Sequence, residues 1–172
     1  AVVLNGRVKV SHDGAILTCN KALLYSSQNL LHAYGDVRIH QGDTLHQKSE
    51  YTSYDGALKK SVSWGNVKVN DPSMTLTTDT LHFDRIKQEL YYNCHGTITS
   101  SENKLTSKNG TYYLEQKKFK ATTNVIVQNP DNTVKSNHLN YYTDNGHVYF
   151  YGPTTIDTKE SIAYAEKGFY DT

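Results

Sequence analysis

Glycine recurs along this chain about every 29 residues, at Gly6, Gly35, Gly65, Gly96 and Gly152, with Thr123 in the fifth place. A second, mostly apolar column has the same period and comprises Leu17, Gln47, Leu76, Leu105, Val134 and Ile162. Two independent columns with one period indicate about six stacked supersecondary units, each burying its apolar face against the next. We expect a single repeat domain over residues 1–172, either as the whole protein or as part of a longer polypeptide.

Each recurring glycine lies within a segment of alternating apolar and polar residues. From Leu31 to Ile39 every second residue is apolar or is Gly35 itself, and the residues between them include His32 and Arg38. This alternation predicts one long strand with an inner and an outer face, and it places the glycine on the inner face. A residue without a side chain there marks a sharp bend or a close backbone approach. The predicted bend glycines of these V-shaped strands are Gly6, Gly35, Gly65, Gly96 and Gly152.

The second strand of each repeat is predicted from segments such as 76–83 and its counterpart 105–112, with a change of parity in its middle. Leu76 and Thr78 share one face, whereas Leu81 and Phe83 share the other, so that a bulge or bend must restore a common inner face. Stacking about six such hairpins predicts an all-β fold of two facing sheets, joined along a crease and open or partly open on the far side. The 14 tyrosines and many threonines suit such half-buried pleated surfaces.

The inner face allows two interpretations, a filled core as in a β-sandwich or a groove held open for lipid. In the second repeat, Gln47, Ser61 and Ser63 interrupt inner columns that are apolar elsewhere. The residues predicted to line the groove are Val8, Val10, Leu17, Leu31, Val37, Ile39, Val67, Val69, Leu76, Leu81, Phe83, Tyr92, Ile98, Leu105, Phe119, Val125, Val127, Val134, Leu139, Val148, Phe150 and Ile156.

Composition and motifs exclude several function classes. The 18 basic and 17 acidic residues nearly balance, which argues against a nucleic-acid-binding surface. The eight histidines are scattered over the repeat, without the spacing of a zinc site, and the two cysteines fall in different columns. Neither a nucleophile elbow nor a phosphate-binding loop is present. We therefore expect no catalytic residue, metal or cofactor.

An outward column contains Lys9, Arg38 and Lys68 at equivalent positions of the first three repeats. Such a row either meets lipid phosphates or other anions or is simply a solvated face. The column does not continue, since Thr99 occupies the next position.

Several short motifs resemble the OstA/LptA-like family of lipopolysaccharide-transport proteins, and in particular OstA-like proteins of the Bacteroidetes type. They are Gly-Asn-Val-Lys-Val at 65–69, Leu-Thr-Thr-Asp-Thr-Leu at 76–81, Tyr-Asp-Gly at 54–56 and Tyr-Phe-Tyr-Gly-Pro at 149–153. The resemblance covers the chain from Gly6 to Phe169 and implies a β-taco, or twisted β-jellyroll, of antiparallel V-shaped strands. It also implies a groove that holds acyl chains, end-to-end assembly through edge strands, and neither a cofactor nor catalysis.

The resemblance leads to a functional expectation: a periplasmic lipid-binding bridge or translocon module of the Gram-negative cell envelope, carrying lipopolysaccharide toward the outer membrane. The expected partners are lipopolysaccharide or a related acylated lipid, other OstA-like domains of the export machinery joined by edge-strand pairing, and further copies in a head-to-tail homo-oligomer. The alternative is a non-catalytic structural or glycan-binding β-solenoid. Its surface tyrosines would stack on sugar rings, and they are Tyr34, Tyr54, Tyr91, Tyr149 and Tyr151.

Overall fold

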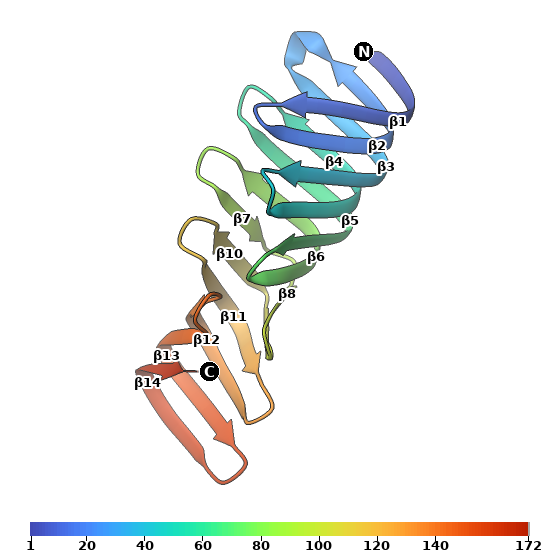
Figure 1. Ribbon diagram of the computed structural model, residues 1–172. Coiled ribbons are helices and arrows are strands. Elements are labelled where there is room, and N and C mark those ends of the chain that lie inside the picture. Colours follow the sequence, from blue (N-terminus) through green and yellow to red (C-terminus); the bar gives the residue numbers. More distant parts are fainter. Residues whose placement is uncertain (172) are drawn as a thin grey trace.

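The computed structural model describes residues 1–171 and consists almost wholly of antiparallel strands. They stack along one long axis, with the two termini toward opposite ends (Figure 1). The strands are β1 (Val2–His12), β2 (Ala15–Tyr25), β3 (Leu30–Gln41), β4 (Leu45–Asp55), β5 (Lys60–Asp71), β6 (Met74–Asp84), β7 (Glu89–Tyr92), β8 (Gly96–Ser100), β9 (Asn103–Ser107), β10 (Asn109–Tyr113), β11 (Lys118–Gln128), β12 (Asn132–Tyr142), β13 (His147–Thr158) and β14 (Ile162–Asp171). Within 1–171 the one helical element is the 3₁₀ turn η1 (Ser26–Gln28).

The long strands are bent in their middle, as the alternating pattern predicts. In β5 the pairing with β6 shifts between Trp64 and Val67, and there Gly65 and Asn66 both have positive φ, of 81° and 51°. A bulge formed by two left-handed residues turns the strand sharply. The same pair of left-handed residues occurs at Gly6–Arg7 in β1 and at Gly35–Asp36 in β3. The all-β fold of V-shaped antiparallel strands is confirmed.

Gly96 differs from the other glycines of its column. Its φ is not positive, and the left-handed residue is its neighbour His95, with φ of 67°. The prediction of one continuous bent strand through Gly96 is wrong, because the chain forms two separate strands, β7 and β8, on either side of residues 93–95. The glycine is needed for a different reason: a Cβ there would lie 2.3 Å from Cζ of Tyr92.

The following strand is also divided. Where the sequence predicts one strand over 105–112, the structure has β9 and β10, separated at Lys108. The backbone of Lys108 bridges the gap, since its carbonyl accepts from the N–H of His95 at 3.0 Å and its N–H donates to the carbonyl of Thr123 at 3.0 Å. These bonds satisfy the backbone polar groups that the broken ladders leave unpaired.

Each bend carries a strand from one of two facing layers into the other, so that hairpin turns lie alternately on the free rims of the two layers. The first layer contains the turns at 26–29, 56–59, 85–88, 114–117 and 143–146, and the second contains those at 13–14, 42–44, 72–73, 101–102, 129–131 and 159–161. The rims meet opposite the crease, along a line that we call the seam. Arg85 reaches Asp13 across it, and Lys117 reaches Asp71. The expected open far side is therefore bridged at these points.

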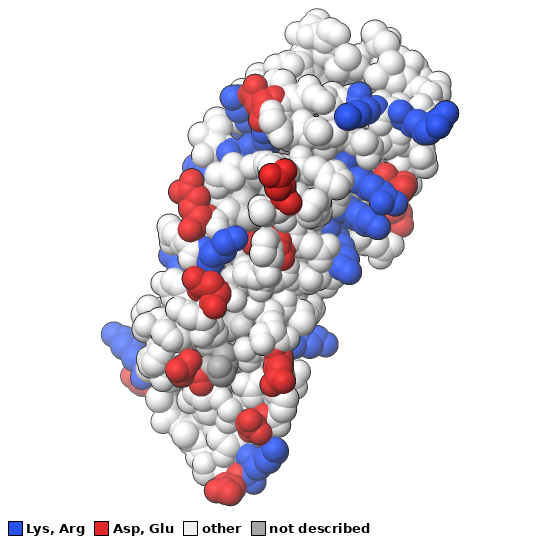
Figure 2. Space-filling model, in the orientation of Figure 1, with Lys and Arg blue, Asp and Glu red and all other residues white. Residues whose placement is uncertain are grey.

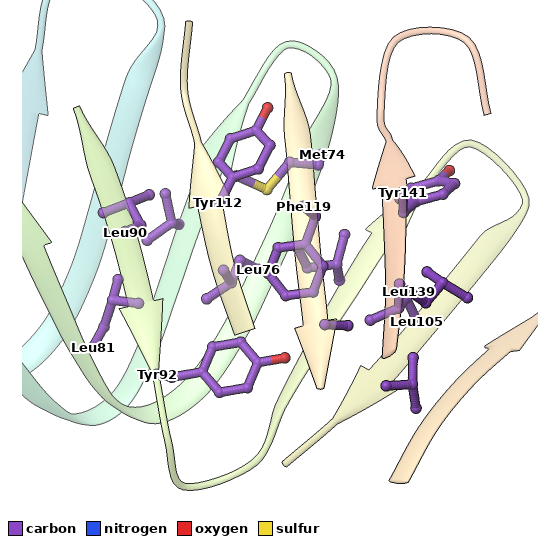
Figure 3. Close-up of a cluster of buried hydrophobic side chains, with 14 of the residues drawn as sticks. Met74, Leu76, Leu81, Leu90, Tyr92, Leu105, Tyr112, Phe119, Leu139 and Tyr141 are labelled. Carbon is purple, nitrogen blue, oxygen red and sulfur yellow. The ribbon is translucent and has the colours of Figure 1, made fainter. Parts of the chain in front are cut away.

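The interior between the layers contains two apolar clusters. The larger one is centred on β6–β12 and packs aromatic against aliphatic side chains, as Figure 3 shows for Tyr92, Phe119 and Leu76. The smaller one lies between β1, β2 and β3 and includes Leu17, Leu31 and Val37 with the smaller Ala22 and Ala33. The twisted stack thus has an interior that is apolar in both halves of its length.

Candidate functional site

The residues that the sequence predicts for the groove all lie on the inner side of the two layers. Nineteen of these 22 are buried, and the others, Val10, Ile39 and Ile156, are partly buried. In the larger cluster the packing is complete, since Leu76, Ile98 and Phe119 have no exposed surface. This part of the interior is filled by its own side chains, so a lipid chain would enter it only if the layers moved apart.

A small cavity remains in the interior near the N-terminal end, with a volume of about 40 Å³. Its apolar lining comes from both layers and consists of Val10, Ala15, Leu17, Leu31, Ile39 and Phe83. His12, Gln41, Tyr54 and Arg85 close it toward the seam, and Ser61 lies on its wall. A volume of this size has room for about one water molecule.

Arg85 closes the seam above this cavity. It begins the turn between β6 and β7 on the rim of the first layer, and its guanidinium crosses to the rim of the second. There Nη2 donates to the carbonyl of Asp13 at 2.7 Å, Nη1 to the carbonyl of His12 at 3.3 Å, and Nε to Oε1 of Gln41 at 3.3 Å. Nη1 also donates to the hydroxyl of Tyr54 at 3.1 Å, which in turn lies 2.8 Å from Nδ1 of His12. The arginine therefore links both rims through neutral oxygen atoms.

A buried polar group stands between the two apolar clusters. Nε2 of Gln47 donates to Oγ of Ser63 at 2.6 Å, Oγ of Ser63 lies 2.8 Å from Oγ1 of Thr52, and Thr52 lies 3.1 Å from Oγ of Ser49. All four residues are buried. The sequence reveals Gln47 and Ser63 as exceptions in apolar columns, but only the folded structure shows that they bond to each other, because the register pairs Gln47 with Val69 and Ser63 with Thr52.

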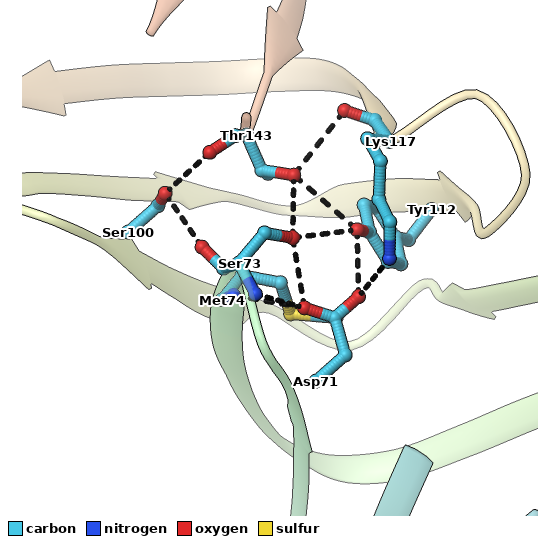
Figure 4. Close-up of polar contacts among 7 residues, drawn as sticks. All are labelled: Asp71, Ser73, Met74, Ser100, Tyr112, Lys117 and Thr143. Carbon is cyan, nitrogen blue, oxygen red and sulfur yellow. Dashed lines mark hydrogen bonds and ion pairs between the residues drawn. The ribbon is translucent and has the colours of Figure 1, made fainter. Parts of the chain in front are cut away.

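A second seam contact, which the sequence pattern does not reveal, is centred on Asp71 (Figure 4). The side chain of Asp71 is 2% exposed. It accepts hydrogen bonds from the N–H and hydroxyl of Ser73, the N–H of Met74, the hydroxyl of Tyr112 and Nζ of Lys117. Burial opposes ionisation, but the bonds from Ser73, Tyr112 and Lys117 outweigh it and hold the pKa of Asp71 below its ordinary value. The sequence marks this position only as a turn.

The chain matches the family of OstA-like proteins over residues 1–137. It is an OstA-like protein. Its fold resembles that of LptH, the LptA-homologous periplasmic component of the lipopolysaccharide transport device of Pseudomonas aeruginosa, with a TM-score of 0.53 and 17% sequence identity over 58% of this chain and 76% of LptH. A comparison with the curated proteins found no match. The family that the short motifs indicate is confirmed, and so is the twisted β-jellyroll that they imply.

The outer face of this OstA-like protein carries a row of basic residues on its second layer. Figure 2 shows Lys and Arg side chains gathered on one side of the stack, over β3–β5. Arg38 is the register partner of Lys48, and Lys48 is the partner of Lys68. The predicted outward column of Lys9, Arg38 and Lys68 is thus joined by Lys48, which the repeat spacing does not reveal. Like charges directly opposite one another cost stability.

The tyrosines considered for sugar stacking lie in different environments in the OstA-like fold. Tyr54 is turned toward the interior and bonds to Arg85. Tyr34 belongs to an outer ladder, in which its ring lies 6.0 Å from that of Tyr51, and the ring of Tyr51 stacks on Trp64 at 5.7 Å. Aromatic ladders on adjacent strands stabilise a sheet by themselves. The others lie on outer faces, where Tyr91 stacks on His82 at 4.6 Å, Tyr149 packs beside Phe169 and Tyr151 beside His138.

The two cysteines of the OstA-like chain are both free. Cys19 is buried, and burial raises the pKa of its thiol. In the part of the chain that the structure describes, no three His, Cys, Asp or Glu side chains come together as metal ligands would. No helix among these residues is long and apolar enough to cross a membrane.

Proposed function

We propose that this OstA-like protein is a periplasmic module that carries lipopolysaccharide, or a related acylated lipid, by its acyl chains toward the outer membrane. The observation that carries the proposal is the two-layered stack whose inner face is apolar in both of its halves. LptH, which shares this fold, is a periplasmic component of a lipopolysaccharide transport device. The family membership over residues 1–137 supports the same role.

The energetics favour a groove that opens when lipid enters. Each methylene of an acyl chain taken from water into an apolar interior contributes about 0.8 kcal/mol. At the crease the backbone of the bent strands runs from one layer into the other. At the seam the layers are joined by side-chain contacts such as those of Arg85 and Asp71. Separation at the seam therefore disrupts fewer interactions than separation at the crease, and the predicted lining residues would then face the lipid.

The edges of the stack supply a means of assembly. Among the described strands, β1 and β14 each pair with a single neighbour. Val2 and Val3 on β1 and Ile162 and Tyr164 on β14 are all more than half exposed. A strand edge with unpaired N–H and C=O groups readily pairs with another strand. We therefore include in the proposal edge-to-edge joining with other OstA-like domains or with further copies.

The test is purification from a Gram-negative host, followed by native mass spectrometry and lipid extraction. The expected result is co-purified lipopolysaccharide or another acylated lipid. Ile39→Asp should reduce it strongly, because Ile39 lines the interior while being only partly buried, so the variant should fold. His40→Asp is the matched control, since the neighbouring His40 is exposed. A lipid-free wild type that also fails to take up added lipid A would refute the proposal.

A glycan-binding role is the second candidate, and the ladder of Tyr34, Tyr51 and Trp64 favours it. Tyr51 and Trp64 are 37% and 38% exposed, so that their outer edges remain accessible to a sugar ring. Titration with the deacylated oligosaccharide of lipopolysaccharide, monitored by Trp64 fluorescence, tests this role. Saturable binding that is lost in Tyr51→Ala would support it, and an unchanged spectrum would exclude it.

A further inference from the structure

We propose that the cavity beneath Arg85 is a binding site for the acyl chain of an anionic, phosphate-bearing amphiphile, and that Arg85 both keeps this site closed and binds the anionic headgroup. The inference rests on the proposed function, because it names the place where lipid first enters the interior. It goes further by assigning a headgroup class and a single entry point, between the turn at 85–88 and the turn at 13–14.

The hydrogen bonds of Arg85 are the first argument. All four acceptors of its guanidinium are neutral: the carbonyl oxygens of His12 and Asp13, the hydroxyl of Tyr54 and the amide of Gln41. Among the ion pairs formed within residues 1–171, none includes Arg85. An arginine bonds more strongly to a phosphate, which accepts two parallel N–H bonds, than to neutral oxygen atoms.

Two carboxylates at the rims beside Arg85, Asp13 and Asp84, are already paired with lysines. Asp13 lies 2.7 Å from Nζ of Lys59, and Asp84 lies 3.4 Å from Nζ of Lys60. The charges of these two carboxylates are thus matched by other cations, which leaves the guanidinium charge available. An anionic headgroup at this rim would be attracted rather than repelled.

The size of the cavity is the second argument. At about 40 Å³ it is far smaller than the apolar cavity of about 150 Å³ that admits benzene. An acyl chain therefore enters only if the rims separate. When Arg85 moves from its neutral acceptors to a phosphate, its four bonds are lost, and within residues 1–171 the turn at 85–88 keeps only the bond from Nε2 of Gln41 to Oε1 of Gln88, at 3.0 Å, to the second layer. Headgroup binding therefore weakens the seam above the apolar site and favours its opening.

The polar group next to the cavity is the third argument. Ser61 lines the cavity, and beyond it along β5 lies Ser63, which bonds to Gln47 and Thr52. An acyl chain that enters beneath Arg85 meets the small N-terminal cluster on one side and these hydroxyl and amide groups on the other. Passing them would take the chain through polar surface, so the N-terminal cluster is the part of the interior that the first chain occupies.

The experiment compares two detergents with the same chain, dodecyl phosphate and dodecyl maltoside, by isothermal titration calorimetry. The wild type should bind dodecyl phosphate about tenfold more tightly than dodecyl maltoside, as expected for a charge-assisted bond in a partly buried site. Arg85→Leu should abolish this preference, and Arg85→Lys should retain part of it. Lys87→Leu is the matched control, since it removes the same charge from an exposed position in the same turn.

A second pair of variants tests the location. Ala15→Phe fills the cavity and should abolish binding of dodecyl phosphate, whereas Ala57→Phe, at an exposed turn position, should not. Circular dichroism and the thermal midpoint establish that each variant is folded. Competition by lipid A, and separately by phosphatidylglycerol vesicles, distinguishes the two kinds of phosphate-bearing lipid that could supply such a headgroup.

The two proposals fail in different ways. If the wild type takes up lipid A but Arg85→Leu and Ala15→Phe bind it equally well, the site beneath Arg85 is refuted and the transport role stands. Equal affinity of the wild type for the two detergents would also refute the role of Arg85. If no acylated ligand binds to the wild type, both proposals are refuted.

Discussion

The hydroxyl of Tyr112 donates to Oδ2 of Asp71 at 2.8 Å, across the seam and between residues that are 41 positions apart in the chain. Tyr112 belongs to β10 in the first layer, and Asp71 ends β5 at the rim of the second. Ser73 and Thr143 extend the contact, since their hydroxyls lie 3.0 Å apart. The layers are therefore held together opposite the crease by a connected polar network rather than by apolar packing alone.

Asp71→Asn should lower the free energy of unfolding by about 1–3 kcal/mol at neutral pH, since hydrogen bonds to a charged group contribute more than neutral ones. The variant keeps the shape of the side chain but loses the charge that Lys117 and Tyr112 contact. The loss should disappear in acid. The folded-state pKa of Asp71 lies below its ordinary value of 3.8, so its contribution is present above that pH and is lost as the pH falls through the lower value. Urea unfolding at several pH values measures the difference, and Asp131→Asn, in a fully surface-exposed pair, is the control.

Two substitutions at the crease should have opposite effects. In Gly65→Ala, a Cβ would lie 2.7 Å from Cβ of Glu50 at a φ of +81°, so we expect a loss of about 1–3 kcal/mol. Thr123 occupies the same place in its repeat with φ of 66°, which is unfavourable for a β-branched residue. Thr123→Gly should therefore raise the stability by about 1 kcal/mol. Thermal unfolding of both variants measures these changes in stability. A Thr123→Gly variant less stable than the wild type would contradict the explanation that positive φ determines the preference for glycine at the crease.

The buried polar group should respond differently to single and combined substitutions. Gln47→Ala leaves the hydroxyl of Ser63 without its amide donor and should lower stability by about 1–3 kcal/mol. Replacing Gln47 by Leu together with Ser49→Ala, Thr52→Val and Ser63→Ala removes all four polar side chains at once, and should recover most of this loss. Chemical denaturation of the single and quadruple variants measures the difference. A quadruple variant less stable than Gln47→Ala would show that the four side chains stabilise the fold by more than hydrogen-bonding to one another.

Gly110 should not tolerate a side chain, for a reason unrelated to backbone angles. A Cβ there would lie 2.3 Å from Cζ of Phe119 and 2.7 Å from Cζ of Tyr92. Gly110→Ala should therefore cost about 1–3 kcal/mol by overpacking. Adding Phe119→Leu should make the alanine less harmful than it is alone. A double-mutant cycle on thermal stability measures this coupling, and strict additivity of the two changes would rule out the ring contact as the cause.

Two buried tyrosines, Tyr92 and Tyr112, should lose their protons only at high pH. Burial raises the pKa of Tyr92 to about 12, and likewise that of Tyr112. Since the folded-state values lie above the ordinary value of 10.0, the stabilisation from the neutral phenols is present below pH 10 and is lost as the pH rises through about 12. Ultraviolet difference spectroscopy should thus show two classes of tyrosine, the later one coinciding with loss of the β-sheet circular dichroism signal. Tyr92→Phe should reduce the later class.

The sequence by itself determined the all-β class, the V shape of the strands and the identity of the inner face. These features depend on the alternation of apolar and polar residues within one strand and on a glycine at the bend. Gly6, Gly35 and Gly65 illustrate this, since each lies at a shift of register with a positive φ. Gly96 shows what the period alone does not predict. It has the same spacing as the other glycines, but a glycine is needed there because the ring of Tyr92 leaves no room for a Cβ, and not because the backbone is left-handed.

Only the tertiary structure decided how the two layers meet. The contacts of Arg85 with Asp13 and of Tyr112 with Asp71 join positions in different repeats, and that of Gln47 with Ser63 joins two positions of one repeat that are not register partners. The repeat period gives which residues share a column, but the twist of the stack sets which turn of one layer lies opposite which turn of the other. Closure of the seam and the small cavity below it depend on which turns lie opposite each other. The twist that sets this accumulates over many strands, so the sequence of a single strand does not predict it.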